Sequence, residues 1–277
     1  MLWRPHVPDS IDGAPLATHI SDLFLDFPYD RLPSNLGLQL FLRPEGVLVM
    51  ILFYLLISKP IFKAIHSVID PKDSGFITSV AVHNFLLALF SACVAINGWP
   101  IMLQHLKKYG VFQTYCDPHD TLWKDSGFGS WTFIFYISKY YEFADTWILV
   151  LKGKQPSFLQ VYHHTGIAFC MWVGVLSHSS WLKYVMLLNS VIHMFMYTYF
   201  FIKTIDPKVE IKAAKNLTMA QIGQFFTGIF ISFPILIMGE KCNSASSRFG
   251  LLCLQLYGYG LVFLFMTFAK RKYKKDK

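Results

Sequence analysis

Residues 156–176 read PSFLQVYHHTGIAFCMWVGVL, an apolar run of the length that an α-helix needs to cross a bilayer, about 20 residues. The run contains no lysine, arginine, aspartate or glutamate. Gln160, His163 and His164 nevertheless stand near its start, where polar side chains are costly in lipid. The stretch therefore predicts a membrane-spanning helix with candidate functional residues inside it.

The composition of the whole chain supports the same interpretation. Of 277 residues, 54% are hydrophobic and only 15% are Asp, Glu, Lys or Arg, whereas a soluble domain has about 25% charged residues. These values exclude a disordered chain, and five cysteines are too few for a disulfide-dense secreted scaffold. The net charge of +8 does not by itself indicate nucleic acid, and we expect no nucleic-acid partner.

Six further apolar stretches of similar length predict an all-α integral membrane protein with seven transmembrane helices. The predicted spans are residues 45–65, 76–98, 131–151, 156–176, 181–202, 217–238 and 249–269. We accordingly divide the chain into an N-terminal lumenal or interfacial segment (1–44), a membrane domain (45–269) and a basic tail (270–277).

Seven spans place the two termini on opposite sides of the membrane. With the C-terminus in the cytosol, more than half of the 25 Lys and Arg residues fall on the cytosolic side, as the positive-inside rule requires. We therefore predict a lumenal N-terminus and a cytosolic C-terminus. Lys274 and Lys275 stand four and three places from the end. That position is similar to a dilysine signal for retrieval to the endoplasmic reticulum, with a plain basic anchor as the alternative.

The cysteines divide according to this topology. Cys116 and Cys242 fall in the two longer loops on the lumenal side, where oxidising conditions permit a disulfide, and we predict that they pair. Cys93, Cys170 and Cys253 lie inside spans and are expected to be small apolar packing residues.

Polar side chains in four of the predicted spans lie at one depth. They are Lys139, Glu142 and Asp145 in the third span, Gln160, His163 and His164 in the fourth, Asn189, His193 and Tyr197 in the fifth, and Gln221 and Gln224 in the sixth. Under the predicted topology, seven of them occupy the cytosolic half of the membrane, namely Glu142, Asp145, His163, His164, His193, Gln221 and Gln224. His163 and His164 lie about seven residues, roughly 10 Å, from that surface. Unrelated packing residues have no reason to share a depth, so we predict one enclosed polar site.

These residues leave three kinds of site open. Histidine and carboxylate ligands suit iron or zinc in a metal-dependent fatty-acyl oxidase. Membrane desaturases, however, need more histidines than these spans supply, and Gln160 stands where a further ligand would be, so we expect no metal. A neutral imidazole can instead be a nucleophile or general base. The third alternative is interhelical hydrogen bonding in a lipid transporter or receptor.

Four motifs, in this order, resemble the ELO family of fatty acid elongases. They are Lys139-Tyr-Tyr-Glu142-Phe-Ala-Asp145-Thr146, Phe158-Leu-Gln160-Val-Tyr-His163-His164, Asn189-Ser-Val-Ile-His193-Met-Phe-Met-Tyr197 and Thr218-Met-Ala-Gln221-Ile-Gly-Gln224-Phe225. The resemblance covers about residues 40–275. Where the family usually has a histidine at the start of its histidine box, this chain has Gln160. That departure is similar to the elongases that act on polyunsaturated acyl chains.

The resemblance implies a protein of the endoplasmic reticulum in which helices two to seven form a barrel of two inverted three-helix units. It implies the condensing step of chain elongation, in which a long-chain acyl-CoA and malonyl-CoA give a longer 3-oxoacyl-CoA, CO2 and CoA. No cofactor is implied, because malonyl-CoA is a co-substrate. The implied partners are acyl-CoA, malonyl-CoA, membrane lipid and the ketoreductase, dehydratase and enoyl reductase that act next. A homodimer is an open alternative.

Roles for the polar residues follow from the resemblance and from their chemistry. We expect His163 to carry the acyl group, His193 to be a second nucleophile or base, and His164 to be an orienting or acid–base partner. The residues expected to bind or orient substrate are Lys139, Glu142, Asp145, Gln160, Asn189, Tyr197, Gln221 and Gln224; the first three are equally compatible with a structural network.

The basic cytosolic loops suit the phosphates of CoA, although positive-inside topology alone would also explain them. The candidate residues are Lys152, Lys154, Lys203, Lys208, Lys212 and Lys215. From the polar site, the acyl chain is expected to run toward the lumen, so that the lumenal helix ends set the accepted chain length.

Overall fold

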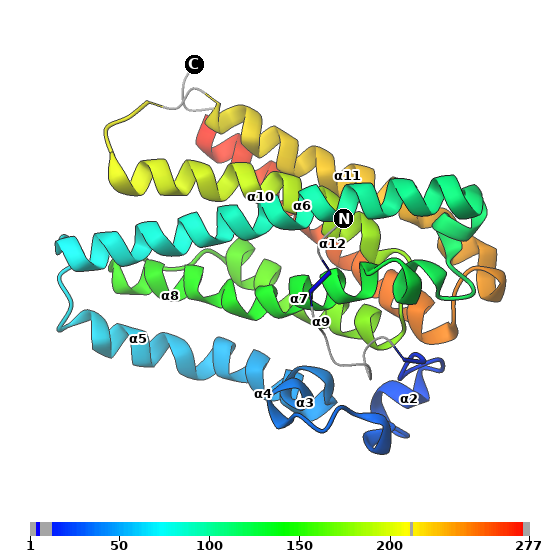
Figure 1. The fold of residues 1–277 in the computed structure, drawn as a ribbon. Helices are drawn as coiled ribbons and strands as arrows, with labels where there is room; N and C mark the ends of the chain where they lie inside the picture. The colour runs from blue at the N-terminus through cyan, green and yellow to red at the C-terminus, as the bar shows by residue number, and fades with distance from the viewer. Residues whose placement is uncertain (1–3, 6–12, 211–212, 274–277) are drawn as a thin grey trace.

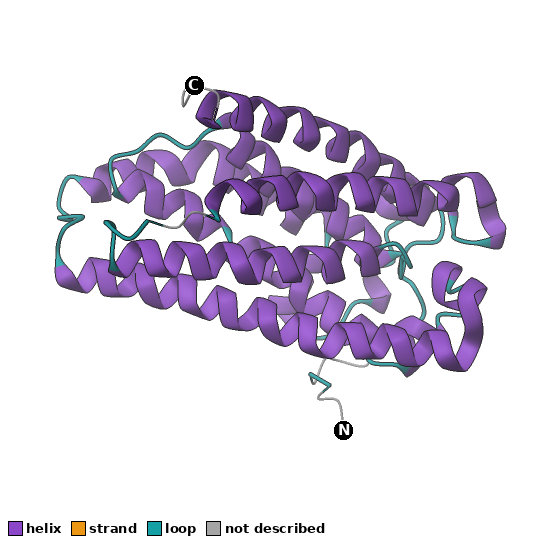
Figure 2. Ribbon diagram, turned by 90° about the horizontal axis from the view of Figure 1, so that it is seen from above, coloured by secondary structure: helices purple, strands orange, loops and turns teal. Residues whose placement is uncertain are grey.

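The computed structural model describes residues 4–5, 13–210 and 213–273, and all regular structure within these ranges is helical (Figure 2). Lys212, Lys274 and Lys275 lie outside the described residues, so the lysine at 212 and the dilysine signal remain predictions.

The long helices lie side by side along one direction (Figure 1). The first is one continuous segment made of α4 (Pro44–Leu52), η2 (Phe53–Ser58) and α5 (Lys59–His66). The helices that follow are α6 (Ser74–Cys116), α7 (Phe128–Tyr141), α8 (Phe143–Leu151), α9 (Phe158–Leu176), α10 (Leu182–Ile205), α11 (Ala214–Met238) and α12 (Ala245–Tyr273). Short helices are α2 (Ser21–Phe24), η1 (Tyr29–Arg31), α3 (Leu36–Leu42), η3 (Thr121–Asp125) and η4 (Gly239–Lys241). We call the end with loops 67–73 and 152–157 the basic end, and the end with loops 117–120 and 177–181 the disulfide end.

Among the residues that the structure describes, five helical segments are long and apolar enough to cross a membrane. They are Pro44–His66, Ser74–Cys116, Leu182–Ile205, Ala214–Lys241 and Ala245–Tyr273. These five correspond to the first, second, fifth, sixth and seventh predicted spans. The fourth predicted span is α9, whose polar first half lowers its mean hydropathy. The third is divided at Glu142 into α7 and α8, so that neither piece alone has the length to cross a bilayer.

Helix α6 extends well beyond its predicted end at residue 98. The carboxylate of Asp73 caps its start by accepting the N–H of Phe76 at 3.1 Å, and Gly110 kinks it with a φ of 81°. Near the far end, the buried ring of His105 contacts Thr114 Oγ1 at 2.8 Å and Thr121 Oγ1 at 3.0 Å. These two contacts of the His105 ring link α6 on one side of the kink to its last turns and to η3.

Six helices contact one another in a closed order. The most extensive contact joins α6 to α10; α10 packs on α11, α11 on α12, α12 on α9, α9 on α7, and α7 on α6. Helices α4 and α5 lie outside this order, against α9 and α8 respectively.

The outward faces of these helices carry large apolar side chains. Examples are Leu48 on α4, Phe85 on α6, Phe195 on α10, Phe230 on α11 and Phe263 on α12, all of them exposed. Exposed apolar area of this extent is unfavourable in water and favourable against lipid tails. The helices and their surfaces together indicate a multi-pass membrane protein.

The segment before α4 is attached to the bundle largely through backbone groups. Ala17 donates its N–H to Leu176 O at 3.1 Å and accepts from Ser246 Oγ at 2.6 Å. The indole of Trp172 donates to Leu42 O at 2.7 Å. This part of the predicted N-terminal segment therefore packs on the ends of α9 and α12, and its separation as a domain remains a prediction.

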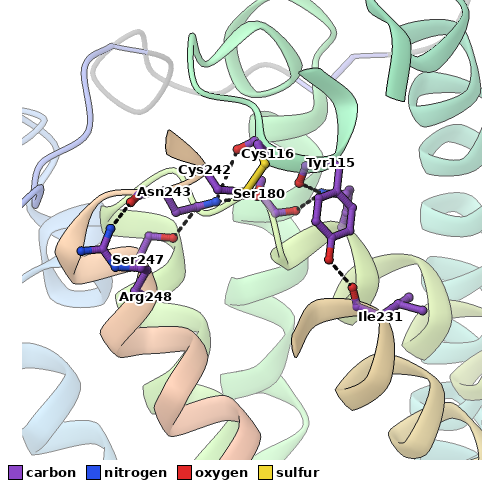
Figure 3. The surroundings of a disulfide bond; sticks show 9 residues. Tyr115, Cys116, Ser180, Ile231, Cys242, Asn243, Ser247 and Arg248 are labelled. Carbon is purple, nitrogen blue, oxygen red and sulfur yellow. Dashed lines mark hydrogen bonds between the residues drawn. A yellow bond between two sulfur atoms is a disulfide. The ribbon is translucent and has the colours of Figure 1, made fainter. Parts of the chain in front are cut away.

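Cys116 and Cys242 form a disulfide between the end of α6 and the loop after α11 (Figure 3). Beside it, Asn243 Nδ2 donates to Ser180 Oγ at 3.1 Å and to Cys116 O at 3.4 Å. Tyr115 Oη donates to Ile231 O on α11 at 2.7 Å. The disulfide end is thus tied together by a covalent bond and hydrogen bonds that link α6, α11 and loop 177–181.

Removing this disulfide should lower stability, because the bond joins residues 126 positions apart. We expect Cys242→Ser to reduce the free energy of unfolding by about 2–4 kcal/mol, mainly by restoring conformational freedom to the unfolded chain. Thermal unfolding in detergent measures the effect. Cys253→Ser, at a free cysteine, is the matched control and should unfold like the unaltered protein. Equal unfolding temperatures for both variants would contradict the prediction.

Candidate functional site

A cavity of about 790 Å³ opens at the basic end and reaches between the helices. Its wall includes ten of the eleven residues predicted for catalysis or substrate orientation: Glu142, Asp145, Gln160, His163, His164, Asn189, His193, Tyr197, Gln221 and Gln224. Lys139 does not belong to that wall but is buried next to Glu142. The helices therefore bring the polar residues of four predicted spans to one cavity, which we call the wide cavity.

A second, narrow cavity of about 80 Å³ continues from the first toward the disulfide end. His163, Asn189, Gln224 and Phe225 belong to the walls of both cavities. Beyond them, the narrow cavity is lined mostly by apolar and aromatic side chains of α9 to α12 and of Trp181. His163 therefore stands where a polar, accessible space meets an apolar one.

Tyr257 on α12 holds the ring of His163. Its hydroxyl lies 2.8 Å from His163 Nδ1 and donates to the carbonyl oxygen of His163 at 3.2 Å. Because the hydroxyl has a single proton, both contacts are satisfied when Nδ1 carries a proton and donates it to the tyrosine oxygen. The lone pair of Nε2 is then free. A Cβ at Gly166 would lie 2.4 Å from the ring of Tyr257, so this approach requires glycine.

His193 faces a buried ion pair. Lys139 Nζ donates to Glu142 Oε1 at 2.6 Å and to Asn189 Oδ1 at 3.2 Å, and both charged side chains are at most 2% exposed. His193 Nδ1 lies 3.7 Å from Glu142 Oε1, and its ring centroid is 6.4 Å from that of His163. Among the described residues, Glu142 Oε2 and His193 Nδ1 have no hydrogen-bond partner. These two atoms can thus form hydrogen bonds with a bound molecule.

The neighbouring His164 occupies an aromatic setting. Its ring centroid is 5.9 Å from those of Tyr54 and Phe143 and 5.5 Å from that of His163. Within the described ranges, no group hydrogen-bonds its Nδ1. His164 is therefore packed beside His163 without a direct hydrogen bond to it.

Asp145 forms its hydrogen bonds with side chains other than Lys139 and Glu142. Its two oxygens contact His83 Nε2 at 2.8 Å and the hydroxyl of Tyr197 at 2.7 Å. His83 Nδ1 in turn lies 3.2 Å from Tyr141 Oη. The sequence prediction missed His83, although the adjacent polar residues His83 and Asn84 stand in the second predicted span at a depth similar to that of the other polar residues.

Three glutamine side chains differ in their contacts. Gln160 Nε2 donates to Thr146 Oγ1 at 2.9 Å, and Thr146 also bonds Tyr54 Oη at 2.8 Å. Gln221 Nε2 contacts Met196 Sδ at 3.3 Å. Gln224 Oε1 is buried and lacks a partner in the described part of the chain. Gln160 therefore supports the packing of α9 on α8, while Gln224 keeps an acceptor free at the junction of the cavities.

Five of the described lysines line the mouth of the wide cavity. Lys152, Lys154 and Lys203 were predicted for this role; Lys72 and Lys272 were not, because the sequence does not show which loops meet. Lys208 and Lys215 are exposed and lie outside the cavity wall. Burial, together with the positive charge of Lys154, lowers the pKa of the Lys152 ammonium. An anion bound in the mouth would offset that repulsion.

A metal ion has one candidate ligand set within the described ranges. Glu142, His163 and His193 each offer a ligand atom, and these atoms lie within 4.8 Å of one another. The Lys139 ammonium, 2.6 Å from Glu142 Oε1, already supplies that carboxylate with a cation. A divalent ion would have to displace it or bind beside it against charge repulsion.

Comparison with known proteins gives a consistent result. The ELO (GNS1/SUR4) family matches residues 39–277. The chain is 34% identical over 171 residues to fatty acid elongase sre1 of Dictyostelium discoideum, covering 60% of this chain and 62% of the relative. It is 28% identical over 206 residues to fatty acid elongase 2 of Trypanosoma brucei brucei, covering 70% and 76%. With long chain fatty acid elongase 2 of Caenorhabditis elegans, identity is 28% over 196 residues, covering 71% of each chain.

Proposed function

The chain belongs to the ELO (GNS1/SUR4) family, and from this premise we propose that it is a fatty acid elongase. The proposed reaction condenses a long-chain acyl-CoA with malonyl-CoA to a 3-oxoacyl-CoA, with release of CO2 and CoA. Such an enzyme is an acyltransferase, a 3-oxoacyl-CoA synthase.

The observation that carries the proposal is the position of His163 at the junction of the two cavities. An acyl-CoA has an anionic, phosphate-bearing half and an apolar half, joined at the thioester. The lysine-lined mouth suits the first and the narrow apolar cavity suits the second. Bound in this way, the thioester would lie beside His163.

In the first step, His163 attacks the thioester carbonyl with the free lone pair of Nε2. The N–C bond forms as the C–S bond breaks, and CoA departs as a thiolate that takes up a proton. The Nδ1–H bond to Tyr257 stabilises the imidazole as positive charge develops on the ring. The group that remains is an acyl-imidazole that keeps its Nδ1 proton, so breaking the N–C bond later returns the neutral histidine.

In the second step, malonyl-CoA loses CO2, and the resulting enolate carbon attacks the acyl carbonyl. A C–C bond forms, the N–C bond to His163 breaks, and the histidine is regenerated. Asn189 Oδ1 accepts from Lys139, which leaves the Nδ2 donors of Asn189 for an enolate or thioester oxygen. His193, beside Glu142, is the proposed base or second nucleophile.

The finer assignments are also part of this proposal. Gln160 in place of the usual histidine supports polyunsaturated acyl chains as substrates. The lysines of the basic end support a cytosolic face there, and Lys274 and Lys275 support retrieval to the endoplasmic reticulum. The closed order of helix contacts supports a six-helix barrel of two inverted units. The ketoreductase, dehydratase and enoyl reductase of the cycle are the proposed functional partners.

The proposal is tested by incubating the purified protein with a long-chain acyl-CoA and malonyl-CoA labelled in its free carboxylate. Labelled CO2 and a 3-oxoacyl-CoA should appear together, and both should require the acyl-CoA. A panel of saturated and polyunsaturated acyl-CoAs then defines the substrate class. Binding of acyl-CoA without any product would overturn the proposal in favour of a transporter or receptor.

The lysines of the mouth should affect substrate binding more than chemistry. We expect Lys154→Ala and Lys72→Ala each to raise KM for acyl-CoA by about threefold to tenfold, with kcat nearly unchanged, because each removes a charged donor to phosphate. Steady-state kinetics at low and moderate salt measure this. Lys215→Ala, at an exposed lysine outside the cavity wall, is the control. A matching rise in KM for the control would assign the effect to overall charge.

Metal dependence is the second candidate, favoured by the Glu142, His163 and His193 cluster. Because Lys139 already neutralises Glu142, we expect chelators to leave condensing activity unchanged within experimental error. Activity is measured before and after dialysis against a strong chelator, with zinc and iron contents determined in parallel. Loss of activity that added metal restores would overturn the acyl-histidine mechanism.

A further inference from the structure

The narrow cavity has a polar pair in its wall, away from the histidines. Ser232 on α11 and Gln255 on α12 both line it, and they are 2% and 4% exposed. Ser232 lies eight residues after Gln224 along α11, roughly 12 Å further toward the disulfide end at 1.5 Å per residue. Apolar residues such as Val185 and Leu254 line the same cavity.

The contacts of this pair determine which way the Gln255 amide points. Its Nε2 donates to Ile229 O at 3.1 Å and to Ser232 Oγ at 2.8 Å. A backbone carbonyl can only accept, so the nitrogen rather than the oxygen must face Ile229. Ser232 Oγ donates its own proton to Gly228 O at 2.6 Å and is therefore able to accept from Gln255.

The carbonyl oxygen of the Gln255 side chain has no hydrogen bond within the described part of the chain. Both N–H groups of the Gln255 amide are engaged, while its Oε1 is buried and finds no partner among residues 4–5, 13–210 and 213–273. A buried carbonyl oxygen without a hydrogen bond is costly and is stabilised by any donor that reaches it. A methylene group cannot donate, and neither can a carbon–carbon double bond.

We infer that Gln255 Oε1 is a recognition point for an acyl chain that carries a hydroxyl group part-way along its length. The inference rests on the proposed function, since it places the acyl chain in the narrow cavity. A hydroxyl at the matching depth donates to Oε1 and supplies its missing hydrogen bond. A plain chain of the same length leaves Oε1 unpaired. The substrate class favoured at this position is therefore the hydroxyacyl-CoAs, regardless of double bonds.

The Gln255–Ser232 bond also links α11 to α12, and an interhelical hydrogen bond needs no ligand. Two variants separate these roles. Gln255→Leu removes Oε1 together with both hydrogen bonds to α11. Ser232→Ala removes one partner of Nε2 but keeps Oε1 and the bond to Ile229 O. Only the first variant should change which acyl chain binds.

The test uses the full-length protein, stearoyl-CoA and a series of monohydroxystearoyl-CoAs, each with its hydroxyl at a different carbon. Dissociation constants are measured by displacement of a fluorescent acyl-CoA, and kcat/KM is measured with malonyl-CoA. We expect one or two adjacent positional isomers to bind about tenfold more tightly than stearoyl-CoA. Gln255→Leu should abolish this preference, whereas Ser232→Ala and the control Leu254→Val should keep it.

The outcomes are distinguishable from those of the proposed function. If no isomer is preferred by the unaltered protein, or if the preference persists in Gln255→Leu, the inference is wrong. The series on the unaltered protein decides this even if Gln255→Leu does not fold. Condensation of stearoyl-CoA without any preference overturns the inference alone. A preference that depends on Gln255, without condensation, supports the inference and overturns the elongase proposal.

Discussion

His163→Ala should reduce condensing activity by about 10⁴-fold or more, the scale seen when a nucleophile that acts with a base is removed. In the proposed mechanism, this residue carries the acyl group, and no other described histidine stands in the walls of both cavities. The expected loss is in kcat, because the mouth lysines that bind CoA are unaltered. Release of CO2 from labelled malonyl-CoA measures it.

A second readout follows the intermediate itself. Incubation with labelled acyl-CoA alone should leave label on the protein that hydroxylamine releases, since an acyl-imidazole is reactive toward amines. The label should be absent in His163→Ala and present in His119→Ala, which alters an exposed histidine in the loop after α6. Full condensing activity in His163→Ala would show that another group is the nucleophile.

Lys139→Met should destabilise the protein by about 3–5 kcal/mol, since breaking a buried ion pair leaves an uncompensated charge. Glu142 would lose its donor at 2.6 Å and would remain 2% exposed, beside His193 and without another cation among the described ion pairs. Midpoints of thermal or denaturant unfolding in detergent measure the effect. Lys215→Met, at an exposed lysine, should unfold like the unaltered protein.

The double variant Lys139→Met with Glu142→Gln distinguishes a structural pair from a catalytic one. It removes both charges, so much of the lost stability should return. If stability returns while condensation does not, the pair orients His193 and Asn189 for chemistry. If both return, the pair is structural only. A single variant as stable as the unaltered protein would contradict the buried-pair interpretation.

Much of this arrangement followed from local features of the sequence. Apolar runs near the thickness of a bilayer predicted the long helices, because backbone groups in lipid must be bonded within a helix. Helical spacing placed Glu142 and Lys139 side by side, three residues apart. Shared depth brought His163, His193 and Gln224 to one cavity, since residues at equal depth on neighbouring helices meet if they face inward.

The depth and spacing of residues in the sequence did not determine which helices pack against each other. Tyr257 on α12 contacts His163 because α12 packs on α9. His83 on α6 contacts Asp145, which lies at the start of α8, directly after the helix α7 on which α6 packs. Asp145 accordingly belongs to a different hydrogen-bond group from Lys139, although they stand only six residues apart. The amide of Gln255 likewise has one oriented, unpaired oxygen because Ile229 and Ser232 approach it from α11.

By itself, then, the sequence determined that this is a helical membrane protein, the approximate bounds of most of its long helices, and the grouping of His163 and His193 in one polar site. The tertiary structure alone decided the partners of those histidines, the lysines that meet at the mouth and the division of the interior into a wide and a narrow cavity. The physical reason is that hydropathy and periodicity act within one helix, whereas hydrogen-bond partners and cavities depend on how separate helices pack against one another.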